Sequence, residues 1–141
     1  MKAINYALKL LKFRPRSENE LRKRMKQKGF DDSEIVEVIE KLKKYGYLNE
    51  LEDAINYVKI KCERGWSKKR IYLGLLIRGY NEQIINEALN NYEKDVVIEK
   101  LKREMRRKHL DKEKLIKLLK SRGFEWDIIK EVLKNDWANK C

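Results

Sequence analysis

Three short stretches of the sequence repeat one pattern: KGFDD at residues 28–32, RGYNE at 78–82 and RGFEW at 122–126. Each consists of a basic residue, a glycine, an aromatic residue and a polar residue. Glycine tolerates the left-handed backbone conformation that commonly ends a helix, whereas a residue with a Cβ atom loses about 1 kcal/mol or more there. The pattern therefore predicts three helix ends, each followed directly by another helix.

Apolar residues at helical spacing flank each glycine. Those eight and four positions before it are Leu21 and Met25, Ile71 and Leu75, and Leu115 and Leu119. Those six and ten positions after it are Ile35 and Ile39, Ile85 and Leu89, and Ile129 and Leu133. Each set shares one face of a helix. Every glycine is thus expected to lie at a corner between two amphipathic helices.

Helix-capping residues fix where these helices begin. N-cap types stand twelve positions before the glycines, at Ser17, Ser67 and Asp111. Ser17 is expected to form a capping box with Glu20, and Asp31 with Glu34. The aromatic residue of each corner should cover the end of the first helix and pack on the second, so the corner sets the angle between them.

A third apolar pattern precedes each helix pair. Its residues are Ile4, Leu8 and Leu11, then Leu51, Ile55, Val58 and Cys62, then Ile98, Leu101 and Met105. The sequence therefore predicts an all-α fold of three tandem three-helix repeats, at residues 1–48, 49–93 and 94–141, in an elongated, curved array. Repeats of this size need their neighbours for stability.

The charge balance points to an anionic partner. The 141 residues include 35 Lys and Arg against 23 Asp and Glu, a net charge of +12. Nucleic acid, an acidic protein surface and anionic lipid could each balance such an excess. No apolar run approaches the roughly 18 residues of a membrane span, and no signal peptide is recognisable. A cytoplasmic protein without membrane contact is expected.

Catalytic activity is the function that the sequence supports least. It holds one histidine, no phosphate-binding glycine loop and no nucleophile at a recognisable spacing from a base. Cys62 and Cys141 make no metal-ligand spacing, and Cys62 lies on an apolar helix face. We expect no catalytic residues, no cofactor and no metal.

Two groups of basic residues are candidates for contact with a partner or with DNA. The helix of the second corner opens with basic residues and closes with another: Lys68, Lys69, Arg70 and Arg78. The helix that opens the third repeat carries Lys100, Lys102, Arg103, Arg106 and Arg107. A solvated charged face is the alternative interpretation, but Glu104 is the single acid between residues 100 and 110, too few for the usual pairing along a helix.

The aromatic residues and the histidine have different expected roles. Tyr72 is the candidate for stacking on a base, whereas Trp66 is expected in the core as a staple over Ile71. His109 is expected to be a surface residue at a helix end. For Trp126 and Trp137 the sequence favours neither a core nor a binding role.

The stretches SENELRKRMKQKGFDDSEIVEVIEKLKKYGYLNE and ERGWSKKRIYLGLLIRGYNEQIINEAL resemble the RecX family of bacterial recombinase regulators, through most of residues 3–92 and more weakly beyond. The most specific pieces are GYL at 46–48 and RGWS at 64–67. The resemblance implies tandem three-helix units that bind the groove of the RecA filament on DNA and restrain its ATP hydrolysis and strand exchange. The chain departs from the family where an arginine and an aromatic residue usually follow GYL, and Lys68 replaces a frequent proline.

Two functional hypotheses follow. In the first, a monomer regulates RecA in recombination and DNA repair by binding its filament, with direct contact to DNA left open. In the second, the protein binds nucleic acid on its own, as a helix-turn-helix protein. Three similar corners suit a long groove better than a single recognition helix and a dimer interface.

The elongated array is tested by solution scattering. A compact domain of this length has a radius of gyration of about 14 Å. We expect a clearly larger value, because no long-range element folds the third repeat back on the first. A value at the compact limit would mean that the repeats pack as one globule.

Overall fold

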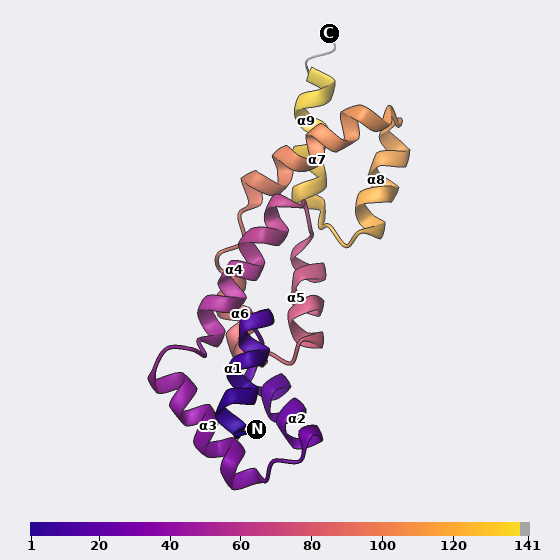
Figure 1. Ribbon diagram of the computed structural model, residues 1–141. Coiled ribbons are helices and arrows are strands. Elements are labelled where there is room, and N and C mark those ends of the chain that lie inside the picture. The colour runs from indigo at the N-terminus through magenta and orange to yellow at the C-terminus, as the bar shows by residue number, and fades with distance from the viewer. Residues whose placement is uncertain (139–141) are drawn as a thin grey trace. The chain divides into compact units, whose positions relative to one another are not determined.

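The computed structural model (Figure 1) describes the backbone of residues 1–138 and the side chains of residues 1–134, so Trp137 and Cys141 lie outside the described side chains. All regular secondary structure within this range is helical, as predicted. The helices are α1 (Ala3–Phe13), α2 (Glu18–Lys28), α3 (Asp32–Lys44), α4 (Glu50–Glu63), α5 (Lys68–Ile77), α6 (Glu82–Leu89), α7 (Lys94–Lys108), α8 (Lys112–Ser121) and α9 (Trp126–Ala138). None of these described helices is both long and apolar enough to cross a membrane.

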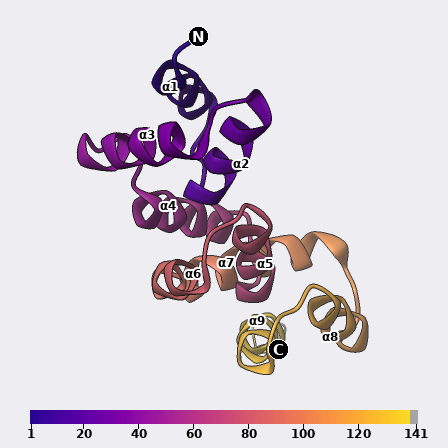
Figure 2. The ribbon, with the colours of Figure 1, turned by 90° about the horizontal axis from the view of Figure 1, so that it is seen from below.

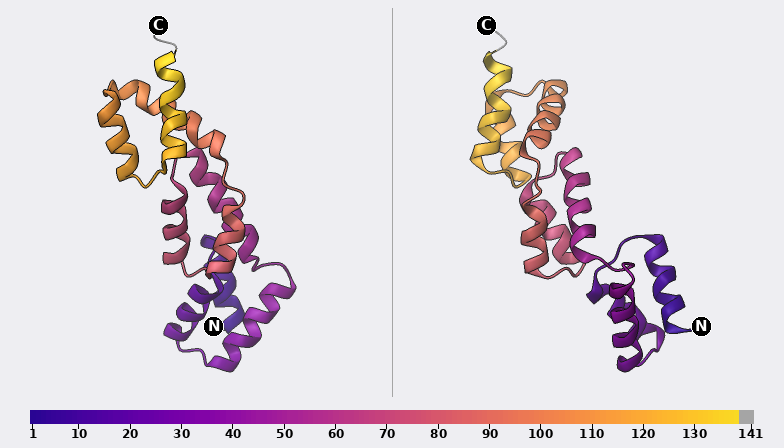
Figure 3. Two further views of the ribbon diagram at one scale, coloured as in Figure 1. Left: turned by 180° about the vertical axis from the view of Figure 1, so that it is seen from behind. Right: turned by 90° about the vertical axis from the view of Figure 1, so that its left-hand side faces the viewer.

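The chain forms two compact units, each built from two segments. The first combines Met1–Ile55 with Leu75–Ala88, and the second combines Asn56–Gly74 with Leu89–Cys141. The division passes through α4 and α5. In the first unit α1 packs on α2 and α3, which also contact each other (Figure 2). In the second unit α7 packs along α9, and α8 contacts α9 (Figure 3).

Most of the apolar positions predicted from spacing form the core of each unit, whereas a smaller group is only partly buried: Ile4, Leu8, Leu11, Leu51, Ile55 and Leu89. In the first unit, the buried side chains are Ala3, Ala7, Leu21, Met25, Ile35, Val38, Ile39, Leu42 and Leu48. In the second, fully buried side chains include Val58, Cys62, Ile71, Val97, Leu101, Leu119 and Ile129. Burying a side chain of this size stabilises the folded state by roughly 1.5–3 kcal/mol. The prediction that Cys62 belongs to the core is confirmed.

The three glycine corners have the predicted backbone conformation. The φ angles of Gly29, Gly79 and Gly123 are 108°, 92° and 89°, in the left-handed region. At each corner the N–H of the following aromatic residue donates to a carbonyl of the helix that ends there, as Phe30 N–H does to Met25. Tyr80 and Phe124 are buried, and Phe30 packs on the core of the first unit. At the second and third corners the aromatic side chain is therefore buried, whereas at the first corner Phe30 is half-buried and Gly29 is exposed.

The predicted caps are present, with one correction. Asp31 and Glu34 form a complete capping box. Ser17 accepts a hydrogen bond from the N–H of Glu20, but the predicted return bond, from the Ser17 N–H to the Glu20 carboxylate, is not made. That carboxylate instead pairs with Arg14 and Arg16, two cations in the loop that precedes α2.

Two of the capping serines also hold a corner that lies far along the chain. The Ser17 hydroxyl donates to the carbonyl oxygen of Arg78 at 2.6 Å, and the Ser67 hydroxyl donates to that of Arg122 at 2.9 Å. Beside the first bond, Asn19 donates its side-chain amide to the carbonyl oxygen of Gly79 at 2.8 Å. No local sequence pattern predicts this serine–corner contact, in which the N-cap of one helix pair is fixed to the glycine corner of the next pair.

The glycine is needed for this contact as well as for its φ angle. A Cβ atom on Gly79 would lie 2.8 Å from the Ser17 hydroxyl oxygen, and one on Gly123 would lie 3.2 Å from that of Ser67. At Gly29, by contrast, a Cβ atom would meet nothing within 4 Å. The first corner therefore has the same backbone conformation without a serine against it.

Comparing alanine at two corners isolates the serine–corner contact. Both Gly29→Ala and Gly79→Ala force a Cβ into the left-handed region, which costs about 1 kcal/mol. Gly79→Ala also displaces the Ser17 hydroxyl, so we expect it to lose about 1 kcal/mol more than Gly29→Ala. Urea unfolding followed by circular dichroism measures both losses. Equal losses would show that the contact adds no stability.

Candidate partner-binding surface

The first turn of α5 carries three cations. Lys68, Lys69 and Arg70 are exposed, as predicted, and the helix has no acidic residue in its first turn. Ser67 caps this helix by accepting from the Arg70 N–H at 3.1 Å. Cations at a helix start oppose the helix dipole and cost a few tenths of a kcal/mol each. The arrangement is thus unfavourable for the helix itself and becomes favourable when an anion is near.

Trp66 lies just before this turn, within the second unit. Its ring meets the Tyr57 ring edge-on with centroids 6.4 Å apart. The Lys61 ammonium lies 4.3 Å and the Arg70 guanidinium carbon 3.7 Å from the ring centroid. Such contacts contribute about 0.5–2 kcal/mol each. The half-buried ring is therefore engaged with its own chain and holds Arg70 in place.

The basic face of α7 is narrower than the sequence analysis predicted. Arg103, Arg106 and Arg107 are exposed, but Lys102 is only 6% exposed, so its assignment to this face was wrong. Lys102 follows Ile98 by four residues and precedes Met105 by three, which places it on the buried side of the helix.

Lys100 is also less free than expected. Its side chain is half-buried, and its Cγ atom would lie 2.9 Å from a Cβ atom on Gly65. The aliphatic part of Lys100 therefore packs over Gly65, where only a glycine leaves room for it, while long side chains of this type keep their charged end in water.

Glu104 forms an ion pair with a cation outside α7. Its carboxylate accepts from the Arg122 guanidinium at 2.8 Å. This hydrogen bond from Arg122 is the main cause that lowers the pKa of Glu104 below its ordinary value of 4.5. Glu104, the single acid between residues 100 and 110, is therefore paired with Arg122, at the glycine corner between α8 and α9.

The remaining predicted residues lie in different surroundings. Arg78 is exposed and belongs to the segment Leu75–Ala88 of the first unit, whereas the other candidates belong to the second. Tyr72 is half-buried, and its stacking role stays a prediction. His109 is exposed in a left-handed conformation at the end of α7, in agreement with a surface role, and Trp126 is 54% exposed.

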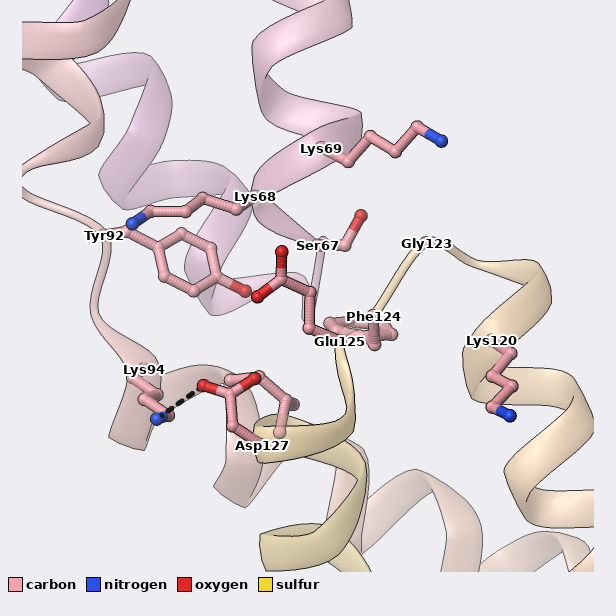
Figure 4. Close-up of a pocket in the computed structure, with 11 residues that line it drawn as sticks. Ser67, Lys68, Lys69, Tyr92, Lys94, Lys120, Gly123, Phe124, Glu125 and Asp127 are labelled. Atoms are coloured by element: carbon pink, nitrogen blue, oxygen red, sulfur yellow. Dashed lines mark hydrogen bonds and ion pairs between the residues drawn. The ribbon is translucent and has the colours of Figure 1, made fainter.

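A cavity of about 450 Å³ brings the start of α5 together with α7, α8 and the last corner (Figure 4). Its charged lining residues are Lys68, Lys69, Lys94, Lys120, Glu125 and Asp127. Lys94 and Asp127 pair at 2.8 Å, and this hydrogen bond lowers the pKa of Asp127. Sequence reasoning missed Lys94 and Lys120, because no local pattern links them to α5.

Metal ligands do not gather anywhere in the part of the chain that the structure describes. There, no group of three histidine, cysteine, aspartate or glutamate side chains lies close enough to hold an ion. Burial raises the pKa of the Cys62 thiol, which favours its protonated form.

Known proteins resemble this chain over nearly its whole length. The family model described as RecX, first three-helix domain, matches residues 3–42. Regulatory protein RecX of Caldanaerobacter subterraneus subsp. tengcongensis is 35% identical over 93% of this chain and 68% of its own length. The protein of the same name from Thermotoga petrophila is 33% identical over 94% and 83%. The crystal structure of RecX from Lactobacillus salivarius superposes with a TM-score of 0.84 at 25% identity, over 94% of this chain and 93% of that one.

The Glu104–Arg122 pair gives a pH-dependent prediction. Because the folded-state pKa of Glu104 is lowered, the pair stabilises the fold above the unfolded value near 4.5 and is lost as the pH falls through the folded value. Glu104→Gln should therefore lower the unfolding free energy at pH 7, by about 1 kcal/mol or less, and lower it hardly at all well below pH 4. Urea unfolding at both pH values measures this; an equal loss at both would contradict it.

Proposed function

This chain belongs to the RecX family, and from that membership we propose that it is a regulator that binds the groove of the RecA filament on DNA. In this proposal, binding restrains ATP hydrolysis and strand exchange during recombination and DNA repair. The relatives that resemble the chain over most of its length carry the name of regulatory proteins. The three corners and their helices would then present a repeated surface to a repeated partner.

The observation that carries this proposal is the exposed charge on α7. Arg103 and Arg107 face solvent, as does Glu99, four residues before Arg103, whereas Glu104, three residues before Arg107, is bound to Arg122. A face that merely needs solvation usually balances its cations with acids three or four positions away. The imbalance on α7 favours an acidic or nucleic-acid partner.

Multivalency explains how weak contacts of this kind could regulate a filament. Single exposed ion pairs contribute about 0–1 kcal/mol, too little for specific binding. When several repeats of one chain meet several subunits, each further contact forms at high effective concentration, and the contacts sum. A chain that bridges subunits would oppose the rearrangements that hydrolysis and strand exchange require. Inhibition should weaken as salt rises, since exposed charges are screened over about 8–10 Å.

The alternative is a stand-alone nucleic-acid-binding protein of helix-turn-helix type. The basic first turn of α5, which follows a capping serine and precedes a glycine corner, favours it. Such a protein would retard naked duplex DNA with sequence preference at roughly physiological salt, whereas the filament regulator needs no preferred sequence.

We propose further that the protein acts by binding alone, as a monomer in the cytoplasm and without a cofactor. The cations of α5 and α7 would serve this role by electrostatic attraction, which steers association and needs no catalytic group.

The proposal is tested with RecA on single-stranded DNA, by following phosphate release. The parent protein in several-fold excess over filament sites should slow hydrolysis, and the double variant Arg103→Glu/Arg107→Glu should lose most of this effect. Lys100 is left unchanged because its stem packs over Gly65. Both arginines are exposed, so helix content should be kept.

A matched control separates the α7 face from net charge. Lys23→Glu/Arg24→Glu makes the same charge change at two exposed positions of α2. It should inhibit like the parent. If the parent leaves the rate unchanged, the regulator proposal fails; if the control loses as much inhibition as the α7 variant, only overall charge matters and the choice of face is wrong.

A further inference from the structure

Two adjoining cavities form a groove between the start of α5 and the end of α8. The first, of about 450 Å³, is the one shown in Figure 4. The second, of about 420 Å³, is lined by Lys69, Arg70, Leu73, Lys120, Ser121, Arg122 and Gly123. Both are lined by Lys69, Lys120 and Gly123, so they meet at the last corner. We call this surface the α5–α8 groove.

The serine–corner contact of Ser67 holds the two sides of the groove together. The bond from Ser67 to the Arg122 carbonyl fixes the start of α5 to the corner that follows α8. A Cβ atom on Gly123 would lie 3.6 Å from both the Cβ and Cδ atoms of Lys69, so the lysine stem runs directly over the corner. Lys69 is thereby held in position, and less side-chain entropy is lost when its ammonium binds an anion.

The charges of the groove are unbalanced. The second cavity has four cationic lining residues, from α5 and from the end of α8, and no acid. Arg122 is bound to Glu104 and Arg70 lies over Trp66. The first cavity does contain acids, but Asp127 is paired with Lys94, which leaves Glu125 near Lys68, Lys69 and Lys120. The groove therefore offers lysine ammonium groups from two helices on either side of one corner.

We infer that the α5–α8 groove binds the phosphate backbone of a nucleic-acid single strand. Lysine ammonium groups are common point-charge ligands of phosphate, and Lys69 and Lys120 line both cavities. The N–H groups of the first turn of α5 add a positive dipole at the same place. Leu73, 45% exposed, lines the same cavity and offers apolar surface to an unpaired base.

This inference deepens the proposed function, because it rests on a regulator that works where DNA is present, and it names the strand as a direct ligand. It concerns a different surface from the α7 cations tested against the filament. The two can therefore fail separately, provided that strand binding is measured without RecA.

The test uses a fluorescein-labelled DNA strand of about 20 nucleotides and follows its anisotropy at salt concentrations between about 50 and 200 mM. The groove variant is Lys69→Gln/Lys120→Gln. Its control is Lys59→Gln/Lys112→Gln, which removes two exposed lysines of the same unit that line neither cavity. All four lysines are exposed, and circular dichroism verifies that both variants fold.

The expected result is a change in salt dependence. Each phosphate contact adds about 0.7 to the slope of log affinity against log salt for a single strand, so the groove variant should lose about 1.4 of the parent slope. The control should keep the parent slope. The inference is overturned if the parent does not bind the strand, or if both variants behave alike.

Two further arms separate other ligands and the proposed function. Preferred binding of a duplex of the same sequence, or of polyglutamate, through Lys69 and Lys120 would overturn the single-strand assignment. The RecA phosphate-release assay is repeated with the groove variant. If the groove binds the strand but the parent protein has no effect on RecA, only the proposed function fails. If the parent inhibits RecA but the groove variant binds the strand as well as the parent does, only this inference fails.

Discussion

The hydrogen bond from a capping serine to the carbonyl that precedes a distant glycine is the contact on which the rest of the structure depends. Ser17 makes it to Arg78 and Ser67 makes it to Arg122. Each serine also accepts from an N–H of its own helix, so one hydroxyl joins a helix start to a helix end about 55–61 residues away. In both cases the bond joins the two separate chain segments that make up one compact unit.

Local features were predictable because short-range rules decide them. The left-handed glycines, the Asp31–Glu34 capping box and the apolar faces all follow from residue types at fixed spacing. The membership in the RecX family was suggested by GYL and RGWS and is supported by relatives of the same name. The serine–corner contact could not be foreseen, because the donor and its acceptor belong to different helix pairs.

The candidate site was predicted less well than the fold, for a related reason. The cations of α5 and three arginines of α7 are exposed as expected. Lys102 was wrongly assigned to the exposed face of α7 because it is basic. Its position, four residues after Ile98, places it on the buried side of the helix. Lys120 was missed because its importance comes from lying beside α5, and Lys100 proved to be a packing residue whose stem requires Gly65. The charge pattern therefore identifies a candidate binding helix, but tertiary contacts decide which of its cations can reach a partner.

The N-cap of the third helix pair is Asp111, which cannot make the serine–corner contact. Asp111 caps α8 as Ser17 caps α2, by accepting a backbone N–H, but an ionised carboxylate has no hydrogen to offer to a carbonyl. A fourth helix pair duplicated behind the third could not be joined by the same bond unless residue 111 became a donor. A copy of the second pair inserted directly behind it would carry its own Ser67 and could lengthen the array in one step, whereas extension behind Asp111 needs an acid-to-alcohol substitution there as well.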